Sequence, residues 1–313
     1  MSTGISDKKG RRSLRALAVS LGAMLLLASG AVSAEAAFPG RNGQLVFSQL
    51  VAFDTPGTSA IELVEPDGAG RRRLAACESG IACRATQPAF SPDGTTIAFA
   101  SGIETGNAIG LVRPDGSLLR RLPQLTAQDI QPAWSPDGAQ LVFSGPQDGG
   151  PLFDIFTTSI ASPAARRLTL RAGTDDGEPA WSTRGKVAFR RHPDLYTMLP
   201  DGRALARLTF RGGADPAWSP YATKLAFERA ADIHIVGADG RGLRRLTFRG
   251  GADPTWSPDG RRIAFTRLET AGGAGRSSIY TVGTDGRDLR RVASVPTGGG
   301  RELADPDWQP LSR

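Results

Sequence analysis

Six polar residues stand immediately before the prolines of a recurring sequence, and four of them are carboxylic acids. In chain order they are Gln87, Gln131, Glu178, Asp215, Asp253 and Asp305. Carboxylates that converge on one point repel each other unless a positive group lies among them, and their oxygens are the ligands that Ca²⁺ prefers. If these positions meet in the fold, we expect them to bind a cation or a basic peptide. The alternative is that each side chain forms local bonds, within its own loop or to the next repeat.

The loops that lead to three of these acids each contain an arginine. The segment LTFRGGADP occurs at 208–216 and again, unchanged, at 246–254, and a third, less similar copy occurs earlier in the chain. These loops place Arg171, Arg211 and Arg249 near the acidic positions. The arginines either pair with carboxylates of neighbouring repeats or form a recognition surface with them, because loops carry most binding sites on rigid scaffolds.

The acids belong to a sequence repeat of the form P-A-[FW]-S-P. Its aromatic residues, separated by 37 to 52 positions, are Phe90, Trp134, Trp181, Trp218, Trp256 and Trp308. A period of this length indicates a repeat architecture. Because the tryptophans recur at one fixed position, we expect them to pack between neighbouring repeats rather than to stack on sugars.

Each repeat predicts four short strands. In the copy that starts at Pro254, the first strand contains Trp256 and ends at a Ser-Pro-Asp-Gly sequence, which favours a tight turn. The runs 263–266, 279–282 and 289–292 then supply the second, third and fourth strands. Four antiparallel strands in about 40 residues are typical of one blade of a β-propeller.

The chain predicts six blades in one all-β domain that covers residues 38–313. The N-terminal blade has candidate second, third and fourth strands at 44–47, 61–64 and 72–74, but it lacks a first strand. The missing strand is present near the C-terminus, at 306–308. We therefore expect a six-bladed β-propeller whose C-terminal strand joins the N-terminal blade, which removes free sheet edges.

The repeat P-x-W-S-P-D-G-x-x-I-A-F, followed by I-Y, D-G and R-x-L-T, resembles the WD40-like repeats of the TolB β-propeller. The resemblance covers essentially the whole chain after the first 37 residues. It implies a six-bladed, exported propeller that binds protein partners at one face and in its central channel. It extends only to the propeller part, because TolB-type proteins carry an α/β domain before it and here the repeats directly follow the N-terminal segment.

Residues 1–36 have the features of a secretory signal peptide. A basic start is followed by an apolar run, 17–32, which is short for a transmembrane span, and by small-residue cleavage sequences. We expect an exported protein, periplasmic or secreted, with no transmembrane segment in the mature chain. Cleavage after residue 34 removes five basic residues and one acid, so the formal net charge falls from +7 to +3. Such a mild charge does not favour a nucleic-acid partner.

Cys77 and Cys83 are the two cysteines of the chain. In an oxidising compartment, two cysteines so close in sequence are expected to form a disulfide that closes a small loop. A metal site would need further ligands nearby, and none has a suitable spacing. We expect no cofactor, with a structural Ca²⁺ among the channel acids as the one alternative.

Few residues favour catalysis. The chain has two histidines, and His234 occupies the third-strand position that Tyr196 and Tyr280 hold in other repeats, where packing explains it. No G-x-S-x-G, H-E-x-x-H or phosphate-binding loop occurs. We expect a monomeric, non-enzymatic propeller that binds a protein or peptide of the cell envelope. The alternatives are a carbohydrate lyase or hydrolase that uses channel carboxylates, and an adhesive module for an anionic envelope polymer.

Overall fold

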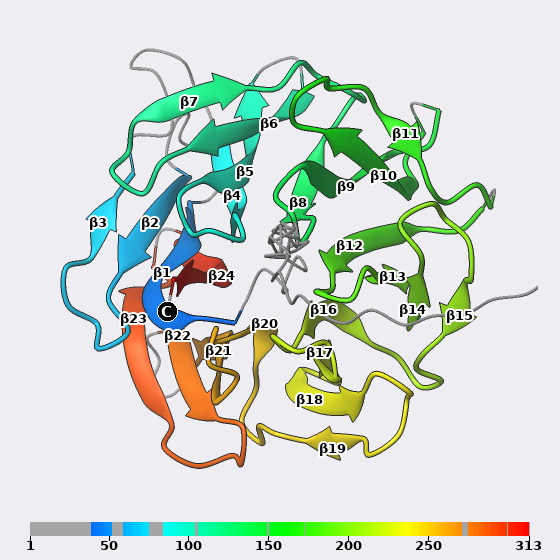
Figure 1. The fold of residues 1–313 in the computed structure, drawn as a ribbon. Helices are drawn as coiled ribbons and strands as arrows, with labels where there is room; N and C mark the ends of the chain where they lie inside the picture. The colour runs from blue at the N-terminus through cyan, green and yellow to red at the C-terminus, as the bar shows by residue number, and fades with distance from the viewer. Residues whose placement is uncertain are drawn as a thin grey trace, which may run out of the picture. The chain divides into compact units, whose positions relative to one another are not determined.

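The computed structural model describes residues 39–51, 59–74, 84–103, 106–148, 150–171, 173–270, 275–298 and 300–312. Every regular element in these residues is a β-strand, and the 24 strands form six sheets of four. The sheets are arranged around a centre like the blades of a propeller (Figure 1). The predicted all-β, six-bladed fold is therefore confirmed.

We number the blades along the chain and give each from its innermost to its outermost strand. Blade 1 consists of β24 (Glu302–Leu311), β1 (Arg41–Leu50), β2 (Ala60–Val64) and β3 (Arg72–Arg73), and blade 2 of β4 (Arg84–Phe90), β5 (Ile97–Ile103), β6 (Gly106–Val112) and β7 (Leu118–Arg121). Blade 3 consists of β8 (Ile130–Trp134), β9 (Gln140–Pro146), β10 (Phe153–Ser159) and β11 (Arg166–Arg167), and blade 4 of β12 (Asp176–Trp181), β13 (Val187–Arg191), β14 (Asp194–Met198) and β15 (Ala206–Arg207). Blade 5 consists of β16 (Ala214–Trp218), β17 (Lys224–Arg229), β18 (Asp232–Gly237) and β19 (Arg244–Arg245), and blade 6 of β20 (Ala252–Trp256), β21 (Arg262–Glu269), β22 (Arg276–Gly283) and β23 (Arg290–Pro296).

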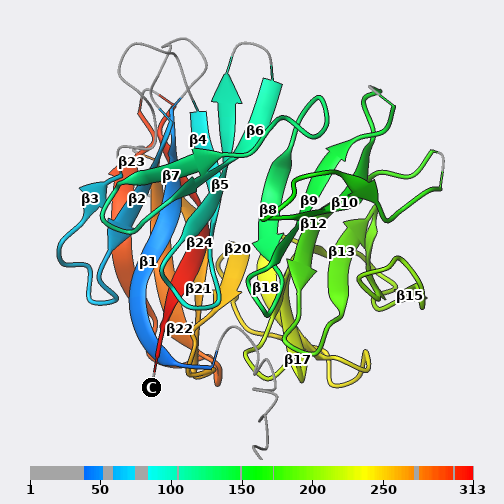
Figure 2. The same ribbon diagram turned by 45° about the horizontal axis from the view of Figure 1, so that its top comes forward.

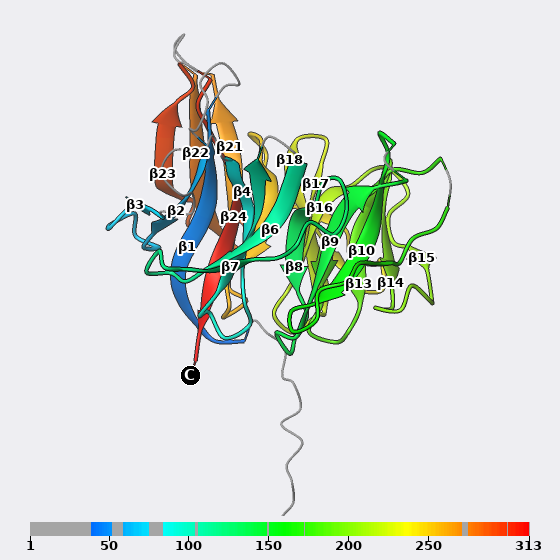
Figure 3. The same ribbon diagram turned by 90° about the horizontal axis from the view of Figure 1, so that it is seen from above.

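Neighbouring strands within every blade are antiparallel. The loops after the second and fourth strands therefore lie at one end of the ring, which we call the upper face because it is at the top of Figure 3. The turns after the first and third strands lie at the other end, the lower face. Each first strand starts at the upper face, so the residue before its proline also lies near that face.

The ring closes within blade 1. Strand β24 pairs antiparallel with β1, with Trp308 opposite Leu45 and Asp307 opposite Val46. Figures 1 and 2 both show these two strands, from opposite ends of the chain, side by side. The indole of Trp308 is fully buried in this blade. The prediction that the C-terminal strand completes the N-terminal blade is therefore confirmed.

The Ser-Pro-Asp-Gly sequence forms a turn on the lower face. In blade 6, the hydroxyl of Ser257 donates to the carboxylate of Asp259 at 2.6 Å and accepts from the backbone N–H of Arg262 at 2.9 Å. Gly260 adopts φ +70°, a conformation that glycine reaches without a steric penalty. Both side chains of the turn thus bond locally, which explains why the sequence recurs.

The hydrophobic core lies between adjacent blades. Trp256 of blade 6 packs with Ile233 and Leu246 of blade 5, and its indole N–H donates to the carbonyl of Ala217 at 3.1 Å. Within blade 5, the ring of His234 lies 5.8 Å from that of Phe227, which belongs to the core between blades 4 and 5. The tryptophans and His234 are packing residues, as their repeat positions predict.

Arginines on four of the six outermost strands bond to the next blade. Each of the four donates to a backbone carbonyl across the gap: Arg72 to Pro114, Arg120 to Ile160, Arg166 to Pro200, and Arg244 to Thr284. The arginine pairs of the repeat therefore have a structural role at the rim of the propeller, and their first member is engaged with protein.

Candidate functional site

A central cavity of about 200 Å³ is lined by the first strands of all six blades. The six residues before the prolines all line it: Gln87, Gln131, Glu178, Asp215, Asp253 and Asp305. The structure thus brings together, on one axis, side chains that lie up to 218 positions apart in the chain. Their convergence creates an acidic half, in blades 4, 5, 6 and 1, and a neutral half, in blades 2 and 3.

These six residues share an unusual backbone. All have φ between +48° and +56°, a left-handed conformation that non-glycine residues rarely adopt. Such a conformation persists where surrounding contacts stabilise it. Here the contacts are hydrogen bonds from one blade to the next.

The hydrogen bonds form a directional ring that is open between blades 5 and 6, where Asp215 accepts no bond from Asp253. The side chain of one residue accepts the backbone N–H of its equivalent in the next blade: Gln131 N–H to Gln87 at 3.1 Å, Glu178 N–H to Gln131 at 2.9 Å, Asp215 N–H to Glu178 at 2.8 Å, and Asp305 N–H to Asp253 at 3.3 Å. Ser48 provides the link from blade 1 to blade 2, because its hydroxyl donates to Asp305 at 3.0 Å and accepts from the Gln87 N–H at 2.9 Å. Most of these side chains therefore bond to the neighbouring blade while they face the cavity.

Two carboxylates stand outside this ring of bonds. In the part of the chain that the structure describes, the carboxylates of Asp215 and Glu228 make no hydrogen bond and no ion pair. Glu228 lies on β17, with its backbone opposite Ala214, next to Asp215 in the first strand. The acidic half of the cavity thus has one lining carboxylate, that of Asp215, without a protein partner, and a second, that of Glu228, on the adjacent strand.

The electrostatics of this half favour a proton or another cation. Burial, with the charges of Glu178 and Asp253, raises the pKa of Asp215 well above its ordinary value. Burial and Asp253 raise the pKa of Asp305 to about 7. Burial, followed by the charges of Asp253 and Glu178, also raises the pKa of Glu228. A positive group placed among these acids would relieve the repulsion and hold them ionised.

One protein cation reaches the edge of the site. Arg190, on β13, donates from Nε to Glu178 at 2.7 Å and lies 3.5 Å from Asp175 through a terminal nitrogen. It therefore compensates Glu178 but contacts neither Asp215 nor Asp253.

Further along the cavity, Asp307 accepts the Phe90 N–H at 2.8 Å, and burial raises its pKa to about 6.

The three loop arginines are placed differently from the acids. Arg171, Arg211 and Arg249 are exposed on the upper face and do not line the cavity. Within the described residues, their side chains form no ion pair with the acidic half. The structure thus separates two surfaces that the sequence places close together.

The predicted disulfide and the predicted signal peptide stay predictions. Cys77 and Cys83 and the N-terminal segment 1–36 lie outside the described residues. Among the residues described, no group of three His, Cys, Asp or Glu side chains has a geometry that could hold a metal ion. In the same residues, no helix is long and apolar enough to cross a membrane.

Sequence reasoning missed Glu228, Arg190 and Ser48. They occupy equivalent places on the second strands of blades 5, 4 and 1, where the other blades carry Ser144, Thr266 and Ala100. Because the residue type changes from blade to blade, no repeat signal marks the position. Only the strand register shows that it lies beside the pre-proline residue.

Part of the chain matches a known family model. Residues 51–195 match the family model described as the TolB beta propeller domain. A search of curated protein sequences found no match.

Several solved structures have a similar fold. TolB from Acinetobacter baumannii is 22% identical with a TM-score of 0.68, and the alignment covers 86% of this chain and 67% of that one. A chain of a nidogen/laminin complex is 14% identical with a TM-score of 0.65, covering 86% and 99%. An oligogalacturonate lyase in complex with manganese is 14% identical with a TM-score of 0.52, covering 79% and 74%. At these identities the likeness establishes the fold alone.

Proposed function

We propose that this chain is an exported, non-enzymatic propeller. We propose further that its central cavity binds a basic segment of a cell-envelope protein. The match of residues 51–195 to the TolB beta propeller domain supports this kind of function. The observation that supports this function is the unpartnered carboxylate of Asp215, which lines the acidic half of the cavity. A second unpartnered carboxylate, that of Glu228, lies on the neighbouring strand and is influenced by the charges of Asp253 and Glu178. A lysine or arginine side chain inserted there would meet carboxylate oxygens that no protein donor occupies.

The shape of the cavity also suits a protruding peptide group. Its volume of about 200 Å³ accommodates one long side chain or a chain terminus, but is small for a folded domain or a polysaccharide. The nidogen/laminin structure is of a complex between proteins, which supports the same use of this architecture. We propose a monomer that presents one such site, without a cofactor.

A melting experiment tests this function. A lysine- and arginine-rich peptide present at 100 times its Kd should stabilise the protein by about 2.7 kcal/mol, because it binds only the folded state. The double variant Asp215→Asn/Glu228→Gln keeps the shape of both side chains and removes two charges, so the increase in Tm should be largely lost.

Asp239→Asn/Asp285→Asn is the matched control. It removes two acids from lower-face turns of blades 5 and 6, and it should leave the peptide-induced shift unchanged. A parent protein whose Tm is insensitive to the basic peptide would sink the proposal. If Ca²⁺ alone raises Tm, and the channel variant abolishes that effect, the cavity is a cation site instead.

Export gives a separate prediction. If residues 1–36 direct the chain into an oxidising compartment, Cys77 and Cys83 should form a disulfide. Thiol labelling of the exported, purified protein without reductant should detect no free cysteine, and labelling after reduction should detect both. Stoichiometric labelling of the unreduced protein would contradict the proposed disulfide.

A further inference from the structure

Three consecutive loops on the upper face expose an apolar side chain next to an arginine. Each loop leads from the outermost strand of one blade to the first strand of the next. The pairs are Leu170 with Arg171, Phe210 with Arg211, and Phe248 with Arg249. The apolar side chains are 75%, 71% and 71% exposed. We call these six residues the apolar–arginine arc.

Folding does not account for this exposure. In each loop the preceding threonine, Thr169, Thr209 or Thr247, is buried and accepts a backbone N–H, so the loop is already anchored. In the loop between blades 2 and 3, the position that corresponds to Leu170, Phe210 and Phe248 is occupied by a polar residue, Gln124. Among the described loops between blades, the arc occupies the three that lead into blades 4, 5 and 6, which supply Glu178, Asp215 and Asp253 to the cavity.

Each aromatic ring of the arc is held in place from one side. The guanidinium of Arg207 lies 4.8 Å from the ring centroid of Phe210, and that of Arg245 lies 4.7 Å from the ring centroid of Phe248. Arg207 is ion-paired with the buried Asp194 and donates to the Thr209 carbonyl at 2.9 Å. An aromatic group fixed on one face and open on the other loses little conformational entropy when a partner covers it.

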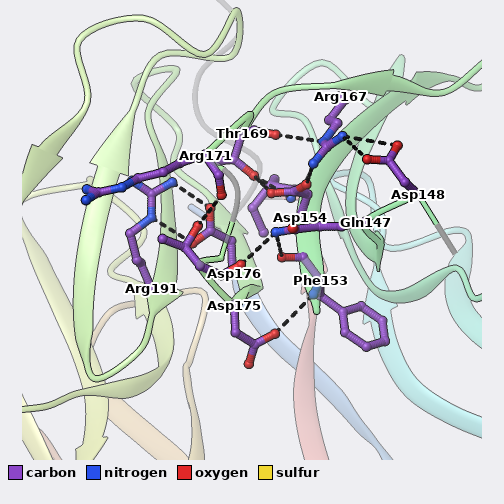
Figure 4. Close-up of polar contacts among 12 residues, drawn as sticks. Gln147, Asp148, Phe153, Asp154, Arg167, Thr169, Arg171, Asp175, Asp176 and Arg191 are labelled. Carbon is purple, nitrogen blue, oxygen red and sulfur yellow. Dashed lines mark hydrogen bonds and ion pairs between the residues drawn. The ribbon is translucent and has the colours of Figure 1, made fainter. Parts of the chain in front are cut away.

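The first loop has the same construction with an aliphatic side chain. Figure 4 shows Arg167 between Asp154 and Asp148, with a further bond to the backbone of Thr169, immediately before Leu170. Three blades thus place an aspartate-bound arginine three positions before an exposed apolar residue, and in two of them the guanidinium lies against the aromatic ring. The repetition gives three anchors at equivalent places around the ring.

The arginines of the arc complement a negative partner. Among the residues described, the guanidinium groups of Arg171, Arg211 and Arg249 make no hydrogen bond or ion pair. A guanidinium binds a carboxylate through two parallel N–H donors. Exposed apolar groups that lie together mark interaction surfaces, and Phe and Arg are enriched in the centres of protein interfaces.

We propose that the apolar–arginine arc is a docking surface for an acidic, amphipathic segment of a partner protein, in which carboxylates alternate with apolar side chains. A membrane surface fits less well, because lipid recognition uses clusters of four to eight basic residues and the arc has one free arginine per blade. The partner chemistry is opposite to that of the cavity, and the two sites are separate.

The test uses two arc variants of the whole protein. One is Leu170→Ser/Phe210→Ser/Phe248→Ser and the other is Arg171→Glu/Arg211→Glu/Arg249→Glu. The matched controls change exposed residues of the same types on the lower face: Leu205→Ser/Leu243→Ser/Leu289→Ser, and Arg241→Glu/Arg261→Glu/Arg287→Glu. Because all these side chains are exposed, every variant should retain the parent Tm.

The ligand probe is a displayed library of random 12-residue peptides, selected on the parent protein and depleted on the serine arc variant. We expect enrichment of peptides that contain both carboxylates and large apolar residues. Their Kd should rise at least tenfold in both arc variants, and it should be unchanged in the lower-face controls and in Asp215→Asn/Glu228→Gln. That last variant separates this proposal from the proposed function of the cavity.

Two results would overturn the proposal. One is a selection that enriches no peptide, or enriches basic peptides, after depletion on the arc variant. The other is arc-dependent binding to vesicles of phosphatidylcholine and phosphatidylglycerol by a protein that binds no acidic peptide, which would make the arc a membrane contact.

Discussion

At the scale of single residues, Asp305 couples the stability of the ring to pH. Burial and the neighbouring Asp253 raise its pKa from 3.8 to about 7. Between these values the folded protein binds more protons than the unfolded chain, so the free energy of unfolding is largest at the acidic end and falls as pH rises. The raised pKa values of Asp253 and Asp307 act in the same direction.

Asp305→Asn should flatten this pH dependence. The amide oxygen can still accept the Ser48 hydroxyl, but the group no longer titrates. Urea unfolding measured from pH 4.5 to 8 should give a smaller decrease in the free energy of unfolding for the variant than for the parent. Asp285→Asn, which changes an exposed acid of a lower-face turn, should behave like the parent. A parent whose stability rises across this range would show that Asp305 is ionised throughout.

The residues of the cavity also show where sequence reasoning is sufficient. The six pre-proline positions are predictable because the repeat marks them and the first strands of a propeller surround its axis. Their left-handed backbone is not, because it depends on hydrogen bonds that exist only after the blades meet. Glu228 could not be predicted for the same reason: strand pairing with Ala214 places it near the acids of the cavity.

At the scale of the elements, the third-to-fourth-strand turns on the lower face contain a natural comparison. Blade 5 has Gly242 at φ +68°, and blade 4 has Ala204 at φ +55° in the matching place. A Cβ added to Gly242 would meet nothing within 4 Å, and Ala204 is exposed. The two turns therefore differ mainly in the backbone penalty of an alanine in a left-handed conformation.

Ala204→Gly should stabilise the protein and Gly242→Ala should destabilise it, each by about 1 kcal/mol. Denaturant unfolding should show the two changes with opposite signs and unchanged m-values. The double variant, with the residues exchanged between the turns, should have close to the parent stability. Equal signs for the two single variants would mean that packing, and not backbone conformation, controls these turns.

The repeats predict the strands well, but they do not predict the aspartate–arginine pairs that hold the upper-face loops. The runs around Trp256 and 263–266 match β20 and the interior of β21, because alternating burial and turn residues are local properties. Buried Asp194 and Asp232 were not recognised as anchors. Each begins a third strand and binds an arginine 13 positions later, so only the hairpin geometry brings the pair together.

At the scale of the whole molecule, closure depends on the last strand. Deletion of residues 304–313 should remove most of β24 and leave β1 without its inner partner. The buried Trp308 is lost with it, and an unpaired, apolar strand edge is exposed. The truncated protein should melt far below the parent and form aggregates, as measured by thermal scanning and light scattering.

Deletion of residues 312–313 alone, which leaves β24 intact, is the control and should have the parent Tm. A truncation at 304 with the parent Tm and solubility would indicate that another segment closes the ring. The closure is predictable from sequence because the two partial blades complement each other, with Trp308 as the recognisable first strand.

The pairing of β1 with β24 has a consequence for the order of folding. Strand β1 is among the first parts of the domain to be synthesised, and its inner neighbour is the last. Contacts between such distant positions form slowly, because the chain must lose the entropy of closing a long loop before the contacts contribute any favourable free energy. Blades 2 to 6 can form from local contacts as the chain grows, whereas blade 1 waits for β24. The propeller therefore becomes a closed ring only after β24 has been synthesised, and until then β1 is the segment that needs protection from other chains.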